Sequence, residues 1–197
     1  MAAKEIKSMH PVEVENVLER LIVLTDSREH DTENFRRRMD VFGLWERVKL
    51  DYGDYSAKSF RNDGTEISLE GKVHIERKMG VSEIINNFCE SGKDSPAVVE
   101  WNKTHPKDKV RNRFEWELKR AQIAGAKIYL VIENASWEHI YGHKYQSRMN
   151  EKAVVATFMA YMARYDVKVL FVNDRLAGQF IKDILRYEMR EELKKYE

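Results

Sequence analysis

Cysteine is almost missing from this chain of 197 residues, because Cys89 is the only one. A single cysteine excludes an internal disulfide and a zinc site built from several thiolates, and it is typical of a protein kept in a reducing compartment. Free cysteines usually behave as small apolar side chains. We therefore expect Cys89 to pack behind a helix.

A strong charge of either sign is missing too, since 34 basic and 33 acidic residues leave a formal net charge of +1. This excludes a global attraction to nucleic acid, so any contact with DNA must come from local basic patches. The chain has no apolar run of about 18 residues that could span a membrane, and its first residues lack the apolar run of a secretory signal. We expect a cytoplasmic protein with no membrane partner.

What the chain does have is enough apolar residues, 43%, for one substantial core. Residues 21–25, 128–132 and 167–172 are apolar runs, typical of strands covered on both faces. Between and after them, apolar residues spaced three and four apart predict helices through Phe35, Met39 and Phe42; Phe114, Leu118 and Ala121; Val154, Phe158, Met162 and Tyr165; and Leu176, Phe180, Ile184 and Leu185. The pattern predicts an α/β fold with a central mixed sheet flanked by helices.

Along the chain we predict the order strand, helix, strand, turn, strand, helix, helix, strand, helix, strand and long helix. Residues 1–20 are predicted to be an N-terminal arm with a short helix over residues 12–20, and residues 21–197 the main domain. Residues suited to capping stand at the expected helix ends: N-caps at Thr32, Ser82, Asn150, and Asn173 or Asp174, and a C-cap at Gly125.

Two stretches interrupt the pattern. Residues 91–110 carry Gly92 and two prolines among four lysines, which predicts a mobile loop. In residues 136–148, aromatic and basic side chains alternate, as in surfaces that stack on bases and neutralise phosphates. The alternative is a surface loop whose aromatic side chains pack back on the domain.

Three polar residues have the spacing of a metal-dependent hydrolytic site. Asp54 lies in a turn, and Glu76 and Lys78 lie near the end of the following strand. Carboxylates are the ligands that hard divalent cations prefer, and a bound cation can assist phosphodiester hydrolysis. Lys78 follows Glu76 by two positions, so on a strand both side chains point to the same face, and Arg77 points to the other. An ammonium group there could stabilise developing negative charge.

Further acids follow the first strand. Asp26 and Glu29, with Arg28 between them, stand at its carboxyl end, where α/β folds commonly place functional groups. Clustered carboxylates repel one another unless a cation neutralises them, which favours a metal site. The alternative for the Glu-Xaa-Lys pair alone is a strand edge with ordinary salt bridges.

Five ordered motifs resemble the XPF-type structure-specific nuclease domain of the PD-(D/E)XK superfamily. They are LIVLTDSRE at 21–29, GDYS at 53–56, HIERK at 74–78, RFEWEL at 113–118 and AGAKIYLVIE at 124–133. The resemblance covers roughly residues 20–195 and is greatest to stand-alone versions from phages and prophages. It implies a restriction-endonuclease-like fold, and the cytoplasm of a bacterial host as the location.

The resemblance also implies an endonuclease that uses Mg²⁺ or Mn²⁺ to cut DNA near flaps, forks or junctions. Asp54 and Glu76 would hold the metal, with Asp26 as a further ligand, and Lys78 would assist catalysis. Glu29 and Arg77 would belong to the same centre. Glu133 ends a later strand, where either buried hydrogen bonding or catalysis is open.

The chain departs from the family pattern at two points. The family has an acid four residues after the motif lysine, but this chain has Ser82 there, followed by Glu83. It also shows no tandem helix-hairpin-helix module. We therefore expect DNA contacts from the domain itself, from a second copy or from another protein, with the candidate contacts Arg28, Arg36, Arg37, Arg113, Lys144 and Arg148.

Two further functions stay open beside the structure-selective nuclease. One is a non-catalytic DNA-binding or scaffold protein of replication or recombination that retains the fold. The other is a restriction-type enzyme that cuts duplex DNA at defined sites. The apolar face of the final helix, from Leu176 to Leu193, could form a homodimer contact or pack on the flank of its own sheet.

Overall fold

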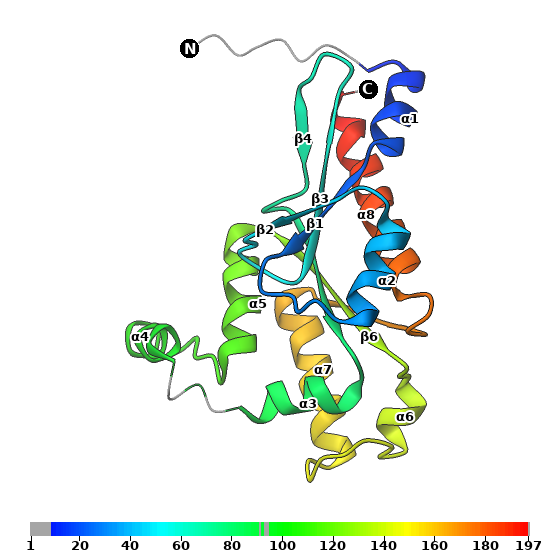
Figure 1. Ribbon diagram of the computed structural model, residues 1–197. Helices are drawn as coiled ribbons and strands as arrows, with labels where there is room; N and C mark the ends of the chain where they lie inside the picture. Colours follow the sequence, from blue (N-terminus) through cyan, green and yellow to red (C-terminus); the bar gives the residue numbers. More distant parts are fainter. Residues whose placement is uncertain (1–8, 91, 93–94, 197) are drawn as a thin grey trace.

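The computed structural model describes residues 9–90, 92 and 95–196. Its centre is a seven-stranded mixed sheet in the order β2-β1-β3-β5-β6-β7, with β4 paired on β3 (Figure 1). β1 pairs parallel with β2, β3 pairs antiparallel with β1 and β5, and β5, β6 and β7 run parallel. The strands are β1 Ile22–Asp26, β2 Trp45–Val48, β3 Tyr55–Phe60, β4 Glu66–Ser68, β5 Val73–Lys78, β6 Lys127–Glu133 and β7 Lys168–Val172.

Helices cover both faces of the sheet, as the sequence predicts. One face is covered by α1, α2 and α8, and the other by α3, α5 and α7 (Figure 1). The helices are α1 Pro11–Glu19, α2 Glu33–Phe42, α3 Val81–Cys89, α4 Pro96–Thr104, α5 Arg113–Ala124, α6 Trp137–Tyr141, α7 Glu151–Tyr165 and α8 Ala177–Leu193, which a 3-10 turn at Lys194–Tyr196 follows.

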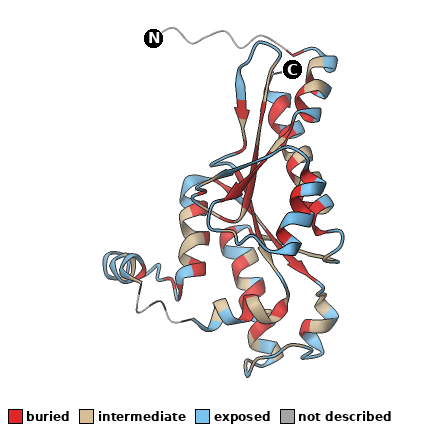
Figure 2. Ribbon diagram, viewed as in Figure 1, coloured by how far each residue is buried: buried red, intermediate tan, exposed pale blue. Residues whose placement is uncertain are grey.

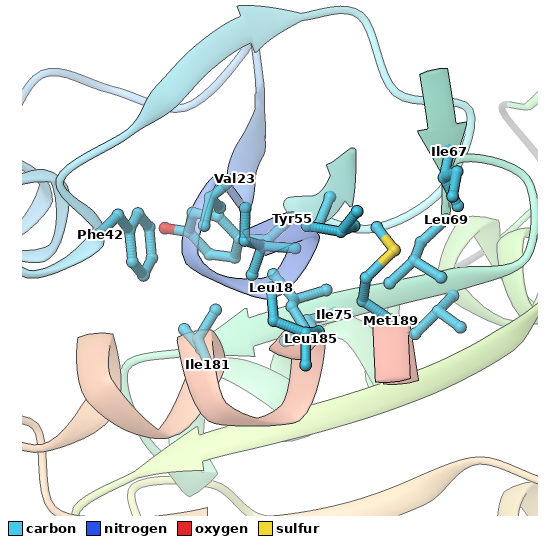
Figure 3. Close-up of a cluster of buried hydrophobic side chains, with 14 of the residues drawn as sticks. Leu18, Val23, Phe42, Tyr55, Ile67, Leu69, Ile75, Ile181, Leu185 and Met189 are labelled. Atoms are coloured by element: carbon cyan, nitrogen blue, oxygen red, sulfur yellow. The ribbon is translucent and has the colours of Figure 1, made fainter. Parts of the chain in front are cut away.

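Each face of the sheet has its own apolar core. On the α8 side, Phe42 and Tyr55 pack edge to face. Ile181, Leu185 and Met189 of α8 belong to the same cluster, in which Met189 lies beside Leu69 (Figure 3). On the other side, the apolar residues of α3, α5 and α7 pack on Ile128, Leu130 and Ile132 of β6. Because successive side chains of β6 point to opposite faces of the sheet, this strand contributes to both cores.

The packing of the final helix bears on the choice between a homodimer contact and packing on its own sheet. Its apolar residues Ile181, Leu185, Met189 and Leu193 are fully buried against the sheet, α1 and α2. These four residues are packed within the chain and are not available for a homodimer contact, whereas Leu176, at the start of the predicted face, is exposed. α1 contributes Val14, Val17 and Leu18 to the same core. The prediction of a separate arm over residues 1–20 includes residues 1–8, which lie outside the described part.

Most helix ends agree with the sequence. Thr32 and Asn150 cap α2 and α7, and Gly125 ends α5 in the left-handed conformation. The other two N-cap predictions are wrong. α3 begins after Gly80, so its N-cap lies two residues before the expected position, and Ser82 accepts a hydrogen bond from the Gln146 N–H instead. α8 begins after Leu176, because Asn173 and Asp174 belong to a preceding turn.

The two irregular stretches contain helices that the sequence patterns do not predict. α4 lies within residues 91–110 and is mostly exposed (Figure 2). Its sequence therefore lacks the regularly spaced apolar residues that would predict a helix. α6 lies within residues 136–148, where Trp137 packs edge to face on Phe158 and Phe171. This supports the alternative of packing back on the domain for Trp137 and Tyr145, whereas Tyr141 is exposed.

Cys89 is a further correction. It is exposed at the end of α3, where the apolar face of the helix has already ended, so it does not pack behind the helix. Among the described residues, no helix is both long enough and apolar enough to cross a bilayer.

Candidate active site

Three acids from separate strands meet in one row at the end of the sheet. Thr25 pairs with Tyr55, and Tyr55 with Ile75, so the next positions set Asp26 beside Asp54 and Asp54 beside Glu76. Backbone hydrogen bonds continue the register: the Asp26 N–H donates to the Asp54 carbonyl at 2.8 Å, and the Asp54 N–H to the Ile75 carbonyl at 2.7 Å. Neighbours across a sheet point their side chains to the same face.

Asp54 and Glu76 form the electrostatic centre of this row. Burial raises the pKa of Asp54 well above its ordinary range, and repulsion from Glu76 raises it further. Burial likewise raises the pKa of Glu76 to about 7, although Lys78 partly offsets this. Two carboxylates held together away from water are costly when both are ionised. Their placement is therefore unfavourable unless a cation joins them.

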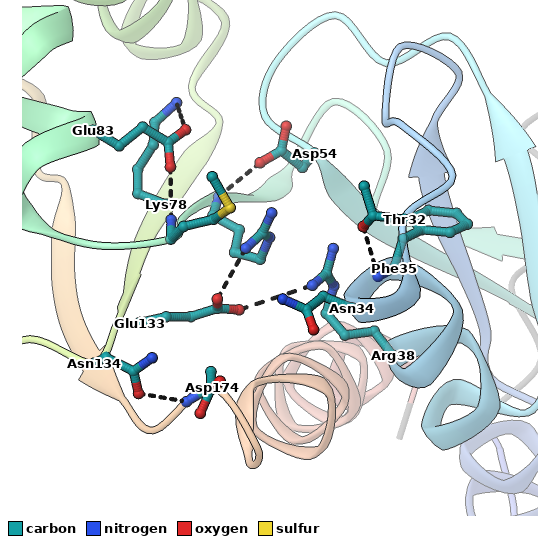
Figure 4. Close-up of polar contacts among 12 residues, drawn as sticks. Thr32, Asn34, Phe35, Arg38, Asp54, Lys78, Glu83, Glu133, Asn134 and Asp174 are labelled. Carbon is teal, nitrogen blue, oxygen red and sulfur yellow. Dashed lines mark hydrogen bonds and ion pairs between the residues drawn. The ribbon is translucent and has the colours of Figure 1, made fainter.

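Lys78 supplies a cation at this point. Its Nζ lies 2.6 Å from Glu76 Oε1. The same Nζ lies 3.7 Å from Glu83 Oε1 (Figure 4). Burial lowers the pKa of the Lys78 ammonium, but the neighbouring Glu76 carboxylate outweighs this and raises it, so Lys78 stays charged. Glu83 also accepts a hydrogen bond from the Met79 N–H at 2.7 Å. Glu83 therefore faces Lys78 although the acid expected at position 82 is a serine.

Asp26 lies in the row but has other partners. Its Oδ1 accepts hydrogen bonds from the backbone and side chain of Arg28, each at 2.7 Å, and its Oδ2 accepts from the Leu50 N–H at 2.9 Å. Burial raises the pKa of Asp26, but these hydrogen bonds outweigh it and lower the pKa overall. As a metal ligand, Asp26 would have to give up part of this network. That role stays a prediction.

Arg77 points to the opposite face, as its place on the strand predicts. Its Nη1 lies 3.0 Å from Glu133 Oε2, and Arg38 Nη1 lies 3.9 Å from Glu133 Oε1 (Figure 4). Glu133 is buried, at 3% exposure. The two arginines compensate its charge, which supports the structural alternative for Glu133. Arg77 also ties this network to the acids, because its backbone N–H donates to Asp54 Oδ2 at 2.8 Å.

Glu29 lies behind the row, on the side of α2. Its Oε2 accepts hydrogen bonds from Tyr55 Oη at 3.2 Å and from Arg38 Nη2 at 3.4 Å. Its charge is close enough to contribute to the raised pKa of Asp54. The structure thus places Glu29 as a neighbour of Asp54 that is held by Arg38.

Gly53 and Glu117 fix the turn that presents Asp54. Gly53 has φ +59°, and a Cβ at this position would lie 2.8 Å from the Ile75 carbonyl oxygen. Its N–H donates to Glu117 Oε1 at 2.6 Å. Glu117, on α5, also raises the pKa of Glu76. Glu117 belongs to the motif at 113–118, but the sequence gives no sign that it is a site residue. Only the packing of α5 shows that it reaches this turn.

A hollow of about 700 Å³ opens beside the row. Glu76 and Lys78 line it together with Arg28 and Arg113, two of the predicted DNA contacts. The other predicted contacts do not line it: Arg36 pairs with Asp31, and Arg37 with Asn34 on α2. Lys144 and Arg148 are exposed in the segment after α6. The structure therefore brings Arg28 and Arg113 to the acids, but not the remaining four.

The residues present fit a hard divalent cation. Among the described residues, none donates a hydrogen bond to Asp54 Oδ1 or Glu76 Oε2, which leaves one carboxylate oxygen of each acid available. Oxygen ligands are what Mg²⁺ and Mn²⁺ prefer, and a cation would relieve the repulsion described above. In the described part of the chain, no three His, Cys, Asp or Glu side chains are grouped closely enough to hold a metal on their own. The candidate ligands are therefore the pair Asp54 and Glu76.

Comparisons with known proteins agree with this geometry. XPF from Aeropyrum pernix superposes with a TM-score of 0.51 at 14% identity, over 85% of this chain and 61% of that one. XPF from Aeropyrum pernix in complex with DNA gives a TM-score of 0.51 at 14% identity, over 87% and 66%. This chain therefore spans less than two thirds of either XPF chain. At this identity the likeness establishes the fold, which confirms the predicted restriction-endonuclease-like architecture.

A search of curated protein sequences gives no significant match. The model of the ERCC4 domain, however, matches residues 25–184, which include every acid of the site. This confirms the resemblance to the XPF-type nuclease domain, so the chain belongs to the ERCC4 domain family.

Proposed function

We propose that this chain is a metal-dependent DNA endonuclease that hydrolyses phosphodiester bonds at branched structures such as flaps, forks and junctions. The observation that carries the proposal is the placement of Asp54, Glu76 and Lys78 on one face at the end of the sheet, with Lys78 Nζ 2.6 Å from Glu76. Family membership and the fold of an XPF that was solved in complex with DNA support the choice of substrate.

In this proposal Asp54 and Glu76 hold Mg²⁺ or Mn²⁺, which would supply an activated water and neutralise charge on the phosphate. Lys78 is fixed beside Glu76, so its ammonium can donate to a phosphate oxygen as negative charge develops there. Asp26 sets Arg28 at the rim of the hollow. Glu29 and Arg77 hold the strand ends behind Asp54.

Structure selectivity is favoured over sequence selectivity. Within the described residues, the fold presents no zinc finger, and its helices pack on the sheet or lie beside the hollow rather than forming a helix-turn-helix pair. A homodimer stays a prediction, as do a phage or prophage origin and a cytoplasmic location.

The proposal is tested by incubating the purified chain with labelled flap, fork and four-way-junction DNA in the presence of Mn²⁺. We expect cleavage near the branch by the wild type and none by Asp54→Asn. Equal behaviour of the two proteins, independent of metal, would favour the non-catalytic scaffold. Discrete fragments from unbranched linear duplex would instead favour a restriction-type enzyme.

A further inference from the structure

One face of α5 forms a wall of the hollow beside the acids. Arg113, Trp116, Glu117 and Arg120 line the hollow, and their spacing of three, four and seven positions places them on the same side of the helix. The apolar residues Phe114, Leu118 and Ala121 are buried toward the sheet. This helix therefore carries a second, polar and aromatic face that borders the hollow.

The size of the hollow limits what can enter it. Its volume of about 700 Å³ is in the range of sites that hold one small organic molecule. The hollow is smaller than a double helix, whose major groove alone is about 12 Å wide, but it has room for a single nucleotide with its phosphate.

The cations of this wall are placed for a phosphate. Arg113 is exposed, and no acceptor within the described residues lies within hydrogen-bonding distance of its guanidinium. Arg120 donates to the Asp51 carbonyl at 3.2 Å, and its Cζ lies 5.2 Å from the centre of the Tyr52 ring. Within the described part of the chain, Arg120 forms no salt bridge with a carboxylate. Two cations on one helix face are thus available beside Glu76 and Lys78.

The aromatic part of the wall is suited to a base. Trp116 is partly exposed, and its ring centre lies 5.0 Å from that of Trp101 on α4, with the rings inclined by 40°. Trp101 in turn stacks on His105 at 3.6 Å. Trp101 therefore supports Trp116 from the side of α4. Stacking on an aromatic side chain binds any base, without sequence preference.

From this arrangement we propose that the hollow binds an unpaired nucleotide of a single-stranded segment, with its base on Trp116 and its phosphate at Arg113 and Arg120. The proposal rests on the proposed function, because it makes single-strand capture beside the acids the reason for cleavage at branches. A duplex without an unpaired segment would lack this contact.

Binding is measured separately from cleavage. In the Asp54→Asn background and in the presence of EDTA, fluorescence anisotropy would give the affinity for a duplex that carries a single-stranded thymidine arm and for the same duplex with blunt ends. We expect the armed duplex to bind more tightly. Adding Trp116→Ala should weaken its binding roughly tenfold, the usual effect of losing one stacked base, and should change binding of the blunt duplex by less than about twofold.

Matched variants separate the hollow from general effects. Arg113→Ala, at an exposed position without a partner among the described residues, should weaken binding of the armed duplex by roughly threefold to tenfold and reduce its salt dependence. Trp116→Phe should keep most of the affinity. Arg20→Ala, beyond the opposite end of β1, and Trp45→Ala, at the sheet edge, should leave binding unchanged. Circular dichroism and thermal unfolding would confirm that each variant is folded.

The proposal is overturned if armed and blunt duplexes bind equally, or if Trp116→Ala and Arg113→Ala bind the armed duplex as tightly as the parent protein. Failure of the proposed function has a different readout, since it would appear as absence of Asp54-dependent cleavage with Mn²⁺. A wild type that cleaves branched DNA while both variants keep the parent's affinity would overturn the nucleotide site alone.

Discussion

Asp54 and Glu76 are adjacent across the ends of β3 and β5, and each raises the electrostatic cost of ionising the pair. The sheet register fixes this closeness, because the Asp54 N–H donates to the carbonyl of Ile75, the residue before Glu76. The folded chain therefore holds two carboxylates where stability alone would not place them. A divalent cation held by both carboxylates, as we propose, would relieve this repulsion.

Asp54→Asn should remove cleavage and stabilise the metal-free protein. At about pH 8, loss of one charge of the repelling pair should raise the free energy of unfolding by about 1 kcal/mol. The gain should shrink as the pH falls, because protonation of Asp54 or Glu76 relieves the repulsion in the wild type as well. Denaturant titrations in EDTA measure this gain in the free energy of unfolding. Asp51→Asn, at an exposed neighbouring position, should show no gain, and an Asp54→Asn protein less stable than wild type would contradict the account.

Binding of Mn²⁺ should depend on pH through Asp54 and Glu76. The pKa of Glu76, about 7, lies above the ordinary value of 4.5, and the pKa of Asp54 is also raised well above its ordinary value, so the metal-free pair carries a proton at pH values where a free carboxyl group is ionised. The metal must displace this proton. Calorimetric titrations should show tighter binding as the pH rises from about 6 to about 8, with proton release near pH 7. An affinity that is constant across this range would count against Glu76 as a ligand.

Lys78→Met should separate catalysis from metal binding. Without the ammonium, cleavage should fall by about 10²- to 10³-fold, because a preorganised donor to the developing charge is lost. Mn²⁺ should still bind, but the rise of its affinity with pH should move to higher pH, since Lys78 no longer lowers the pKa of Glu76. Lys152→Met, on the exposed start of α7, is the matched control. Unchanged cleavage by Lys78→Met would remove Lys78 from the mechanism.

Gly53→Ala should disturb the turn that presents Asp54. Its Cβ would lie 2.8 Å from the Ile75 carbonyl oxygen, at a φ of +59° that alanine rarely adopts. We expect a loss of about 2 to 3 kcal/mol in the free energy of unfolding, together with loss of cleavage. Gly64→Ala has a φ of +83° but meets no atom within 4 Å, so it should cost only about 1 kcal/mol. Equal losses for the two variants would show that the close approach to Ile75 is unimportant.

Arg77→Ala should act mainly on stability. It leaves Glu133 buried, with Arg38 Nη1 at 3.9 Å as its remaining partner. Removing one partner of a buried ion pair typically costs about 3 to 5 kcal/mol, and we expect the lower end because Arg38 remains. Arg36→Ala, which breaks an exposed pair with Asp31, should change stability by less than about 1 kcal/mol. Thermal unfolding compares the two. An Arg77→Ala protein as stable as wild type would show that the ion pair with Glu133 is dispensable.

The sequence predicts the parts of the molecule that have regularly spaced apolar residues or a recognisable motif. The apolar runs give β1, β6 and β7, and the two-residue spacing correctly places Glu76 and Lys78 on one face and Arg77 on the other. Asp54 and Glu76 are identified by their motifs, and the register explains why they meet. Glu117 has no such signal, because its place beside Gly53 depends on how α5 packs.

Sequence patterns do not predict the features of the molecule that depend on tertiary contacts. α4 is mostly exposed and so lacks an apolar face, and α3 begins after Gly80 without a side-chain cap. The apolar face of α8 is equally consistent with a dimer and with intramolecular packing until the sheet is in place. Asp26 is a related case: its spacing brings it into the row of acids, but its carboxylate is already held by Arg28 and Leu50.

An anomalous difference map from a crystal of this protein soaked in Mn²⁺ would show directly whether Asp54 and Glu76 share a metal ion. We expect a peak in contact with carboxylate oxygens of both residues, absent from a crystal of Asp54→Asn treated in the same way. A map in which Mn²⁺ binds elsewhere while both carboxylates stay without metal would contradict this expectation.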